Sequence, residues 1–291
     1  MNVLDRAVLA TLPLVPKPIM RRFAAPYIAG ETLEEAVGQL KELQDRGFPG
    51  VLDCLGEDVA DEAEARGAFE IYRGGADAVK AAGLDCYVSV KPTHFGLRLS
   101  KDLCRSLYEE LVAHCAEIGV FVRVEMEDRT TTDDTLEIFH GLRAKHENVG
   151  IVLQARMFRT PADIDALPAQ CDVRIVQGIY LEPAEVAHTE RHPIIDAYIE
   201  MTEKLLRAGH KVAAATHDDP VIEGVLAVRD KVGADRDRIE FEVLKGVRPK
   251  LWEQLKGRGE TVRVYLPYGP DWKAYSLRRF KENPEILRHV M

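Results

Sequence analysis

Short apolar runs alternate with longer amphipathic stretches along this chain, and this alternation constrains the fold more than any other feature. Each run is rich in β-branched residues, as is typical of buried strands. Eight runs occur, at Gly50–Gly56, Leu84–Lys91, Val120–Glu127, Val149–Arg156, Val173–Tyr180, Lys211–Asp218, Ile239–Gly246 and Thr261–Gly269. Strand–helix alternation repeated eight times predicts a parallel sheet closed into a (β/α)8 barrel.

The stretches between these runs predict helices. The clearest are Glu31–Arg46, Glu57–Ala82, Ser100–Ile118 and Asp133–His146. Ser100 and Thr132 stand where N-caps are expected, and glycines 47, 83 and 119 stand where helices should end. We also expect residues 1–30 to form a helical extension, and Asp271–Glu282 to form a helix over the barrel mouth after the last strand.

A doubly wound sheet is the competing architecture. It would normally have fewer strands, and a dinucleotide-binding version would carry a GxGxxG motif. The sequence has no such motif; Gly257-Arg258-Gly259 lacks the third glycine. A single barrel domain over residues 1–291 is therefore the simplest prediction.

Charge and cysteine content exclude several classes of protein. The net charge of −9 argues against a nucleic-acid binder, which needs a basic face. No apolar run is long enough to predict a transmembrane helix. The five cysteines are scattered, without a CxxC motif, which fits a reducing cytosol better than a disulfide framework or a zinc site. His188 and His192 have i, i+4 spacing, but Pro193 follows, so we assign no metal.

Charged residues alternate with apolar ones in two of the predicted strands. Arg123, Glu125 and Glu127 share one strand face, and Tyr87, Ser89 and Lys91 share the equivalent face of the preceding strand. The opposite faces are apolar and should meet the helices, so the polar faces should line the barrel. Lys91 and Glu125 lie near the ends of neighbouring strands, which predicts an ion pair. That pair could serve the active site or simply fill the barrel.

Other strand ends carry polar side chains as well. These are Gln154 and Arg156; Arg174, Gln177 and Tyr180; Thr216, His217 and Asp218; and Tyr265 and Tyr268. Each alone is a weak signal. Because active sites of such barrels lie at the carboxyl ends of the strands, the whole set predicts a polar pocket there.

The segment after the last strand contains two adjacent arginines. Tyr275, Arg278 and Arg279 have i, i+3, i+4 spacing and share one face of the predicted helix. Paired guanidinium groups match the two oxygens of a carboxylate. The alternative is a solvated basic face, since Lys281 and Arg288 follow.

Several of these segments together resemble the proline dehydrogenase family, in its bacterial monofunctional form. The C-terminal signature is Tyr265-Leu-Pro-Tyr-Gly269, Trp272 and Tyr275-x-x-Arg278-Arg279. The upstream motifs follow in family order: Ser89-Val-Lys91-Pro-Thr93, Val124-Glu-Met-Glu-Asp128, Ile151-Val-Leu-Gln154, Val176-Gln-Gly-Ile-Tyr180, Ala215-Thr-His-Asp218 and Gly246-Val-Arg248-Pro249. The resemblance extends from about residue 30 to the end of the chain.

The resemblance implies a barrel that binds FAD without a Rossmann motif and oxidises L-proline to 1-pyrroline-5-carboxylate. It also implies roles for individual residues. The substrate would be held by Lys91, Glu125, Tyr265, Arg278 and Arg279, and the flavin by Gln154, Arg174, Gln177, Thr216, His217 and Glu282. Quinone or another acceptor would take the electrons. We expect a cytoplasmic protein, leave open a peripheral contact with the inner membrane, and make no prediction of oligomeric state.

The chain departs from the family pattern at several positions. Glu125 stands for the usual aspartate, Gln177 for lysine, Glu242 for glutamine and Lys245 for an aromatic residue. Pro92 and His94 replace leucine and glutamine. These departures leave open a paralogue that oxidises another cyclic or N-alkyl amino acid, and a catalytically silent flavin-binding barrel. A Schiff-base aldolase using Lys91 is a third alternative, although Glu125 nearby would raise the pKa of that lysine.

Overall fold

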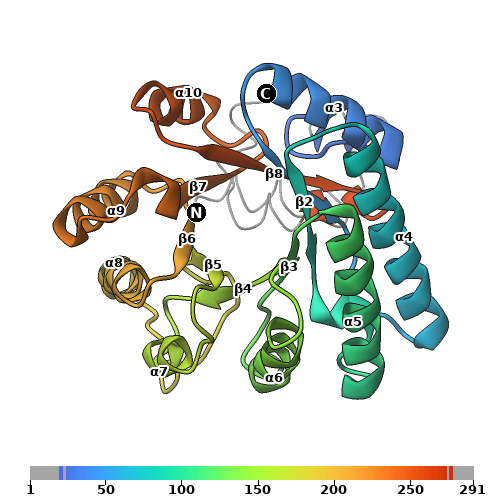
Figure 1. Ribbon diagram of the computed structural model, residues 1–291, viewed down its shortest axis with the longest axis horizontal. Helices are drawn as coiled ribbons and strands as arrows, with labels where there is room; N and C mark the ends of the chain where they lie inside the picture. The colour runs from blue at the N-terminus through green and yellow to red at the C-terminus, as the bar shows by residue number, and fades with distance from the viewer. Residues whose placement is uncertain (1–19, 22–23, 274, 278–291) are drawn as a thin grey trace, which may run out of the picture.

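The structure is a computed structural model that describes residues 20–21, 24–273 and 275–277. Its eight strands form a closed parallel barrel in sequence order, with β8 pairing back onto β1 (Figure 1). The strands are β1 (Gly50–Cys54), β2 (Cys86–Val90), β3 (Val122–Val124), β4 (Val149–Gln154), β5 (Asp172–Val176), β6 (Lys211–Ala215), β7 (Ile239–Leu244) and β8 (Val262–Tyr268). All eight predicted strands are confirmed, and the barrel architecture with them.

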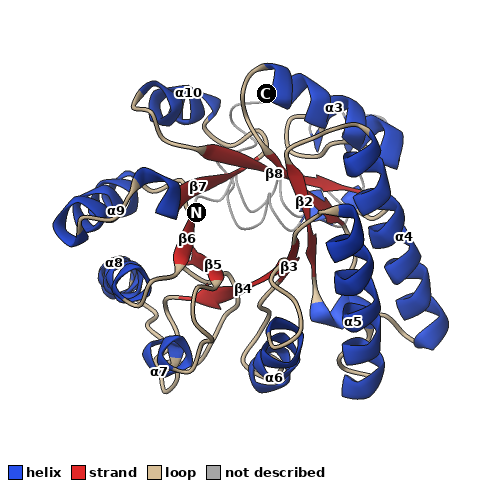
Figure 2. Ribbon diagram, viewed as in Figure 1, coloured by secondary structure: helices blue, strands red, loops and turns tan. Residues whose placement is uncertain are grey.

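Helices surround the barrel, as Figure 2 shows. The α-helices are α3 (Leu33–Asp45), α4 (Glu62–Ala81), α5 (Lys101–Ile118), α6 (Thr132–Arg143), α7 (Thr160–Asp165), α8 (Arg191–Arg207), α9 (Asp219–Val232) and α10 (Pro249–Gly257). Two 3-10 helices, η2 (Pro92–Phe95) and η3 (Arg236–Arg238), complete the described elements. Within the described part of the chain, no helix combines the length and the apolar character needed to cross a bilayer.

The predicted helix boundaries mostly hold. The Ser100 hydroxyl caps α5 by accepting a hydrogen bond from the amide of Leu103 at 3.2 Å. Glycines 47, 83 and 119 all have positive φ angles directly after a helix. The predicted N-cap at Thr132 is wrong, because Thr132 is already the first residue of α6. Its hydroxyl donates to the carbonyl of Asp128 in the preceding turn, so it cannot cap the helix.

The main hydrophobic core lies between the barrel and its helices, where the outward-facing strand residues are buried. A second, smaller cluster joins residues near the N-terminus to the segment after β8. It consists of Met20, Ala24, Ile28, Leu55, Trp272 and Tyr275. Lys245 reinforces this junction, since its ammonium donates to the carbonyls of Ala25 and Pro26 at 3.0 and 2.9 Å.

Lys245 thus holds the chain before α3 against the barrel. The predicted extension over residues 1–30 lies largely outside the described residues. Half of the predicted helix over Asp271–Glu282 is described, and residues 272–273 and 275–277 in it are helical.

The barrel interior is polar, as the strand alternation predicted. Arg123 on β3 is completely buried and forms an ion pair with Asp172 on β5 at 2.6 Å. Its guanidinium also lies over the ring of Tyr87, with 5.3 Å between Cζ and the ring centroid. Arg123, Asp172 and Tyr87 thus fill part of the barrel interior with paired polar groups.

Candidate active site

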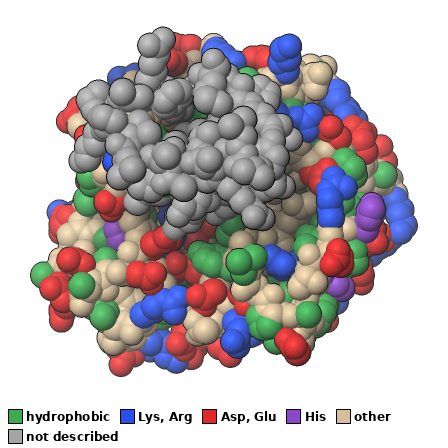
Figure 3. All heavy atoms as spheres, turned by 180° about the vertical axis from the view of Figure 1, so that it is seen from behind, with side chains coloured by type: hydrophobic (Ala, Val, Ile, Leu, Met, Phe, Trp, Pro, Cys, Tyr) green, Lys and Arg blue, Asp and Glu red, His purple; other side chains and the backbone are tan. Residues whose placement is uncertain are grey.

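A cavity of about 1440 Å³ opens at the carboxyl ends of the strands. Eight of the predicted site residues line it together: Lys91, Glu125, Gln154, Arg174, Gln177, Thr216, His217 and Tyr265. Figure 3 views the molecule from this side, and acidic side chains gather beside the atoms drawn in grey. The other three predicted residues, Arg278, Arg279 and Glu282, lie outside the described residues.

Lys91, at the end of β2, contacts a carboxylate that the sequence analysis did not single out. Its Nζ lies 3.3 Å from Oδ1 of Asp53 on β1. The predicted pairing with Glu125 is therefore corrected to a direct pair with Asp53. Asp53 is only 1% exposed, and burial together with the charge of Glu125 raises its pKa despite the opposing effect of Lys91. Burial would lower the pKa of Lys91, but Asp53 and Glu125 outweigh that effect and raise it.

Glu125, which follows β3, is bound instead by groups from other strands. It accepts hydrogen bonds from Ser89 and from the guanidinium of Arg174 on β5. The Tyr265 hydroxyl on β8 donates to the same carboxylate at 3.2 Å. Burial would raise the pKa of Glu125, but Arg174, the Ser89 hydroxyl and Lys91 outweigh it and hold that pKa below its usual value. Glu125 therefore stays ionised at neutral pH.

The described residues predicted to hold a flavin lie on β4 and β5 or directly after β5 and β6. Gln154 Nε2 donates to the Glu127 carbonyl at 2.8 Å, which leaves its buried Oε1 without a hydrogen-bond partner among the described residues. His217 accepts from the Leu244 amide at 2.9 Å through Nε2, so Nδ1 carries the proton of the neutral ring. The cavity therefore presents a fixed acceptor at Gln154 and a positioned imidazole at His217.

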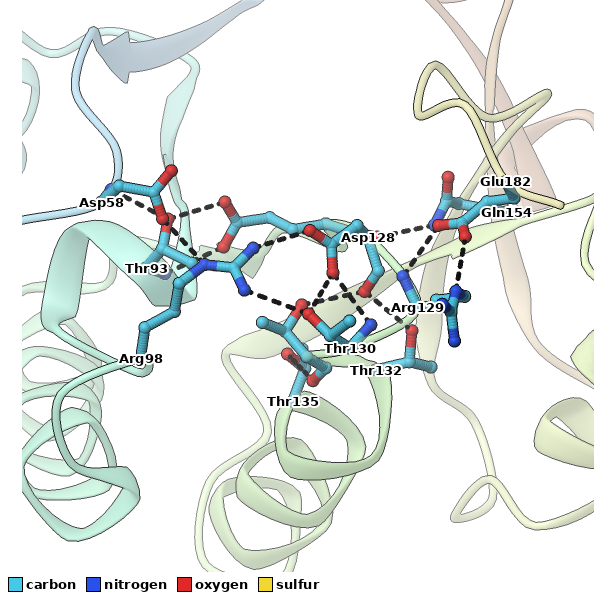
Figure 4. A network of polar contacts seen from close by, with 12 residues as sticks. Asp58, Thr93, Arg98, Asp128, Arg129, Thr130, Thr132, Thr135, Gln154 and Glu182 are labelled. Carbon is cyan, nitrogen blue, oxygen red and sulfur yellow. Dashed lines mark hydrogen bonds and ion pairs between the residues drawn. The ribbon is translucent and has the colours of Figure 1, made fainter.

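Polar contacts join the loops around the cavity mouth (Figure 4). Arg98 bridges Asp58 after β1 and Asp128 after β3, with distances of 2.8 and 2.6 Å. Glu127 accepts from both the amide and the hydroxyl of Thr93 at 2.8 and 2.7 Å. These bonds fix the β1–α4, β2–α5 and β3–α6 loops relative to one another.

A further hydrogen bond in Figure 4 joins the β3–α6 loop to the β5–α8 loop. The Arg129 amide donates to the carboxylate of Glu182 at 2.8 Å, and the Glu182 side chain is only 2% exposed. The loops after β1, β2, β3 and β5 are thus joined to one another by hydrogen bonds and ion pairs.

Asp53 is the principal residue that the sequence analysis missed. A signal was present, because Asp53 is the one charged residue in the run Gly50–Gly56. Every residue of β1 is buried, so a charge in that strand has to face the barrel and find a partner there. Applying the alternation argument to this strand as well would have found it.

His94 follows Lys91 in η2 and is 8% exposed. Its Nδ1 lies 3.4 Å from the Tyr72 hydroxyl. Burial, helped by the charge of Lys91 and opposed by Glu57, lowers the pKa of His94 to about 4. His94 is therefore neutral in the folded protein at neutral pH.

We predict that His94→Gln reduces the loss of stability in mild acid. As the pH falls below 6.5, His94 becomes protonated in the unfolded chain, whereas in the folded protein it stays neutral until about pH 4. The unfolded state therefore binds more protons, and the folded protein loses stability between these two pH values. The difference corresponds to about 3 kcal/mol of unfolding free energy. Denaturant unfolding across the window measures it. His192→Gln, on the exposed start of α8, should retain the wild-type dependence, and equal profiles for His94→Gln and wild type would contradict the prediction.

Comparisons with known proteins identify the family of this chain. A family model described as proline dehydrogenase matches residues 36–290. The chain is similar to the proline dehydrogenase of Deinococcus radiodurans, at 36% identity over 94% of this chain and 90% of the relative. It is 33% identical to proline dehydrogenase 2 of Bacillus subtilis, over 91% of this chain and 88% of that one.

Among solved structures, proline utilization A (PutA) from Bdellovibrio bacteriovorus has the same fold, with a TM-score of 0.84 and 23% identity. The match covers 90% of this chain but only 32% of that longer one. The family resemblance first seen in the ordered motifs is confirmed by these matches, and the chain belongs to the proline dehydrogenase family of oxidoreductases.

Proposed function

We propose that this protein is a flavoenzyme that oxidises L-proline to 1-pyrroline-5-carboxylate with FAD as its hydride acceptor. The observation that carries the proposal is the convergence of eight separately predicted residues on one cavity at the catalytic end of the barrel. The curated relatives are named for the same activity, and the match covers nearly their whole length. They give no support to an aldolase or to a silent barrel.

Membership of the family implies a flavin, and the cavity fits one. Its volume exceeds the roughly 300–1,000 Å³ of pockets for drug-sized ligands. The unpartnered, buried Oε1 of Gln154 suits a donor on a ligand, because a buried acceptor is otherwise costly. We propose that Gln154, Arg174, Gln177, Thr216 and His217 hold the flavin, together with Glu282, whose role rests on the sequence resemblance alone.

The chemistry divides between cofactor and protein. A bound flavin would supply the acceptor for a hydride from the ring CH2 carbon next to the proline nitrogen, and the nitrogen would lose its proton as the C=N bond to that carbon forms. The protein positions the substrate ring and keeps water away from it. We assign substrate binding to Tyr265, Lys91 and Glu125, which line the cavity together. We assign the substrate carboxylate to Arg278 and Arg279, as the sequence resemblance implies.

The reduced enzyme must pass two electrons on. We propose a quinone as the acceptor, as the sequence resemblance implied, and a cytoplasmic location. Reoxidation of the reduced protein by a soluble quinone, compared with oxygen, tests the first point. Much faster reoxidation by the quinone supports it, and equal rates count against it.

We predict that the flavin is bound without a covalent link and is FAD. No cysteine or histidine stands in an attachment pattern, and the five cysteines are buried thiols. Acid precipitation should therefore release all yellow colour into the supernatant, where mass spectrometry should identify FAD. Colour retained in the pellet would show a covalent link, and FMN in the supernatant would exclude FAD as the cofactor.

A further inference from the structure

The floor of the cavity, formed by Asp53, Lys91, Glu125, Arg174 and Glu242, contains one guanidinium held between two carboxylates. Arg174 Nε lies 2.5 Å from Oε2 of Glu242 on β7, and Nη1 of Arg174 pairs with Glu125. The exposed fractions of these side chains are 3% for Arg174, 2% for Glu242 and 13% for Glu125. Water therefore screens these charges poorly, and they act strongly on any group bound beside them.

Tyr87 completes the arrangement. Arg174 Nη2 donates to the Tyr87 hydroxyl at 3.0 Å, and that hydroxyl donates to Glu242. Glu242 is thus fixed by both Arg174 and Tyr87, and all three come from different strands. The carboxylate cannot turn away when a ligand binds, because turning would leave its charge buried without a partner.

The charges of the cavity floor do not sum to a positive value. Lys91 and Arg174 carry two positive charges, whereas Asp53, Glu125 and Glu242 can carry three negative charges. Even a protonated Asp53 leaves the sum at zero. Arg174 therefore does not act on the cavity as an isolated cation. Its positive charge is offset by Glu125 on one side and by Glu242 on the other.

We infer that Glu242 is a positioning residue that sets the reduction potential of the bound flavin by neutralising Arg174. The inference rests on the proposed function. A flavin gains negative charge when it takes up electrons, and a fixed carboxylate in a poorly screened site opposes that gain. Glu242 consequently makes the flavin harder to reduce and makes the reduced flavin a better donor to its acceptor.

Glu242→Gln tests the inference, since it removes the charge and keeps the shape. Arg174 retains Glu125 and Tyr87, so the barrel should fold. We expect the two-electron equilibrium between the bound flavin and a reference dye to shift about tenfold toward reduced flavin, which is about 30 mV. The measurement is made without proline, so it does not depend on turnover.

Glu240 provides the matched control. It lies two residues earlier on β7, pairs with Arg263 at 3.0 Å, and does not line the cavity. Burial raises the pKa of Glu240 to about 7, so the comparison is made about one unit above that value, where it is ionised. Glu240→Gln should leave the dye equilibrium within about threefold of wild type, because its charge lies a further two residues, roughly 7 Å, along the strand.

An unchanged equilibrium in Glu242→Gln, or an equal shift in both variants, would overturn the inference. Glu242→Met is measured alongside and interpreted in the same way, should the glutamine variant fail to fold. If the wild-type protein binds flavin and proline reduces it, but neither Glu242 variant shifts the dye equilibrium, only the role of Glu242 is wrong. A protein that binds no flavin removes the proposed function and this inference together.

Discussion

Lys91→Met should destabilise the protein by about 3–5 kcal/mol and abolish most turnover, because it leaves the Asp53 carboxylate buried without its cation. The loss of unfolding free energy should be smaller at about pH 5 than at about pH 8. Burial already raises the pKa of Asp53, and without Lys91 it rises further. A carboxyl group whose folded pKa is raised destabilises the fold progressively as the pH climbs above its unfolded value. Denaturant unfolding at both values and steady-state kinetics measure the effects.

Two further variants separate this explanation from a general effect of losing a lysine. Lys91→Met combined with Asp53→Asn should recover much of the stability but none of the turnover, because no unpaired charge remains. Lys101→Met removes a surface cation paired with Asp134 and Glu137, and should leave the unfolding free energy close to the wild-type value, because solvent screens exposed ion pairs. Unchanged unfolding and unchanged kinetics in Lys91→Met would remove the pair from the account.

Arg278→Met and Arg279→Met should each raise KM for proline by one to two orders of magnitude. Charge-assisted bonds to a carboxylate contribute about 1.5–3 kcal/mol each, and about 1.4 kcal/mol corresponds to tenfold. Lysine at either position should rescue only in part, because an ammonium cannot reproduce the planar fork. Steady-state kinetics give KM, and flavin absorbance shows whether the cofactor is retained.

Arg207→Met is the matched control, since Arg207 is an exposed arginine on α8 that pairs with Glu203. It should leave KM unchanged. An inhibitor with the proline ring and carboxylate but no oxidisable carbon–nitrogen bond should lose affinity in parallel with KM. If KM and inhibitor affinity both stay at wild-type values with flavin retained, the carboxylate is bound elsewhere.

The barrel could be predicted because its signal is local. Apolar runs such as Val149–Arg156 are short and rich in β-branched residues, and eight of them occur along the chain with amphipathic stretches between them. Period-two alternation also placed Arg123 and Glu125 correctly inside the barrel. Both conclusions need only neighbouring residues and the geometry of a strand.

The partners of these charges could not be predicted in the same way. Lys91 has carboxylates on both neighbouring strands, Asp53 on β1 and Glu125 just after β3. Which one it contacts depends on Arg174, which reaches Glu125 from β5, 49 residues away in the chain. Alternation gives the face of each side chain, but only the closed barrel decides which groups meet across it.

Anaerobic mixing of the flavin-loaded protein with L-proline, without any acceptor, tests the central claim most directly. The account predicts that the visible absorption of the flavin bleaches, with one 1-pyrroline-5-carboxylate formed for each flavin reduced. A protein whose flavin stays oxidised in excess L-proline, yet is reduced at once by dithionite, would contradict it.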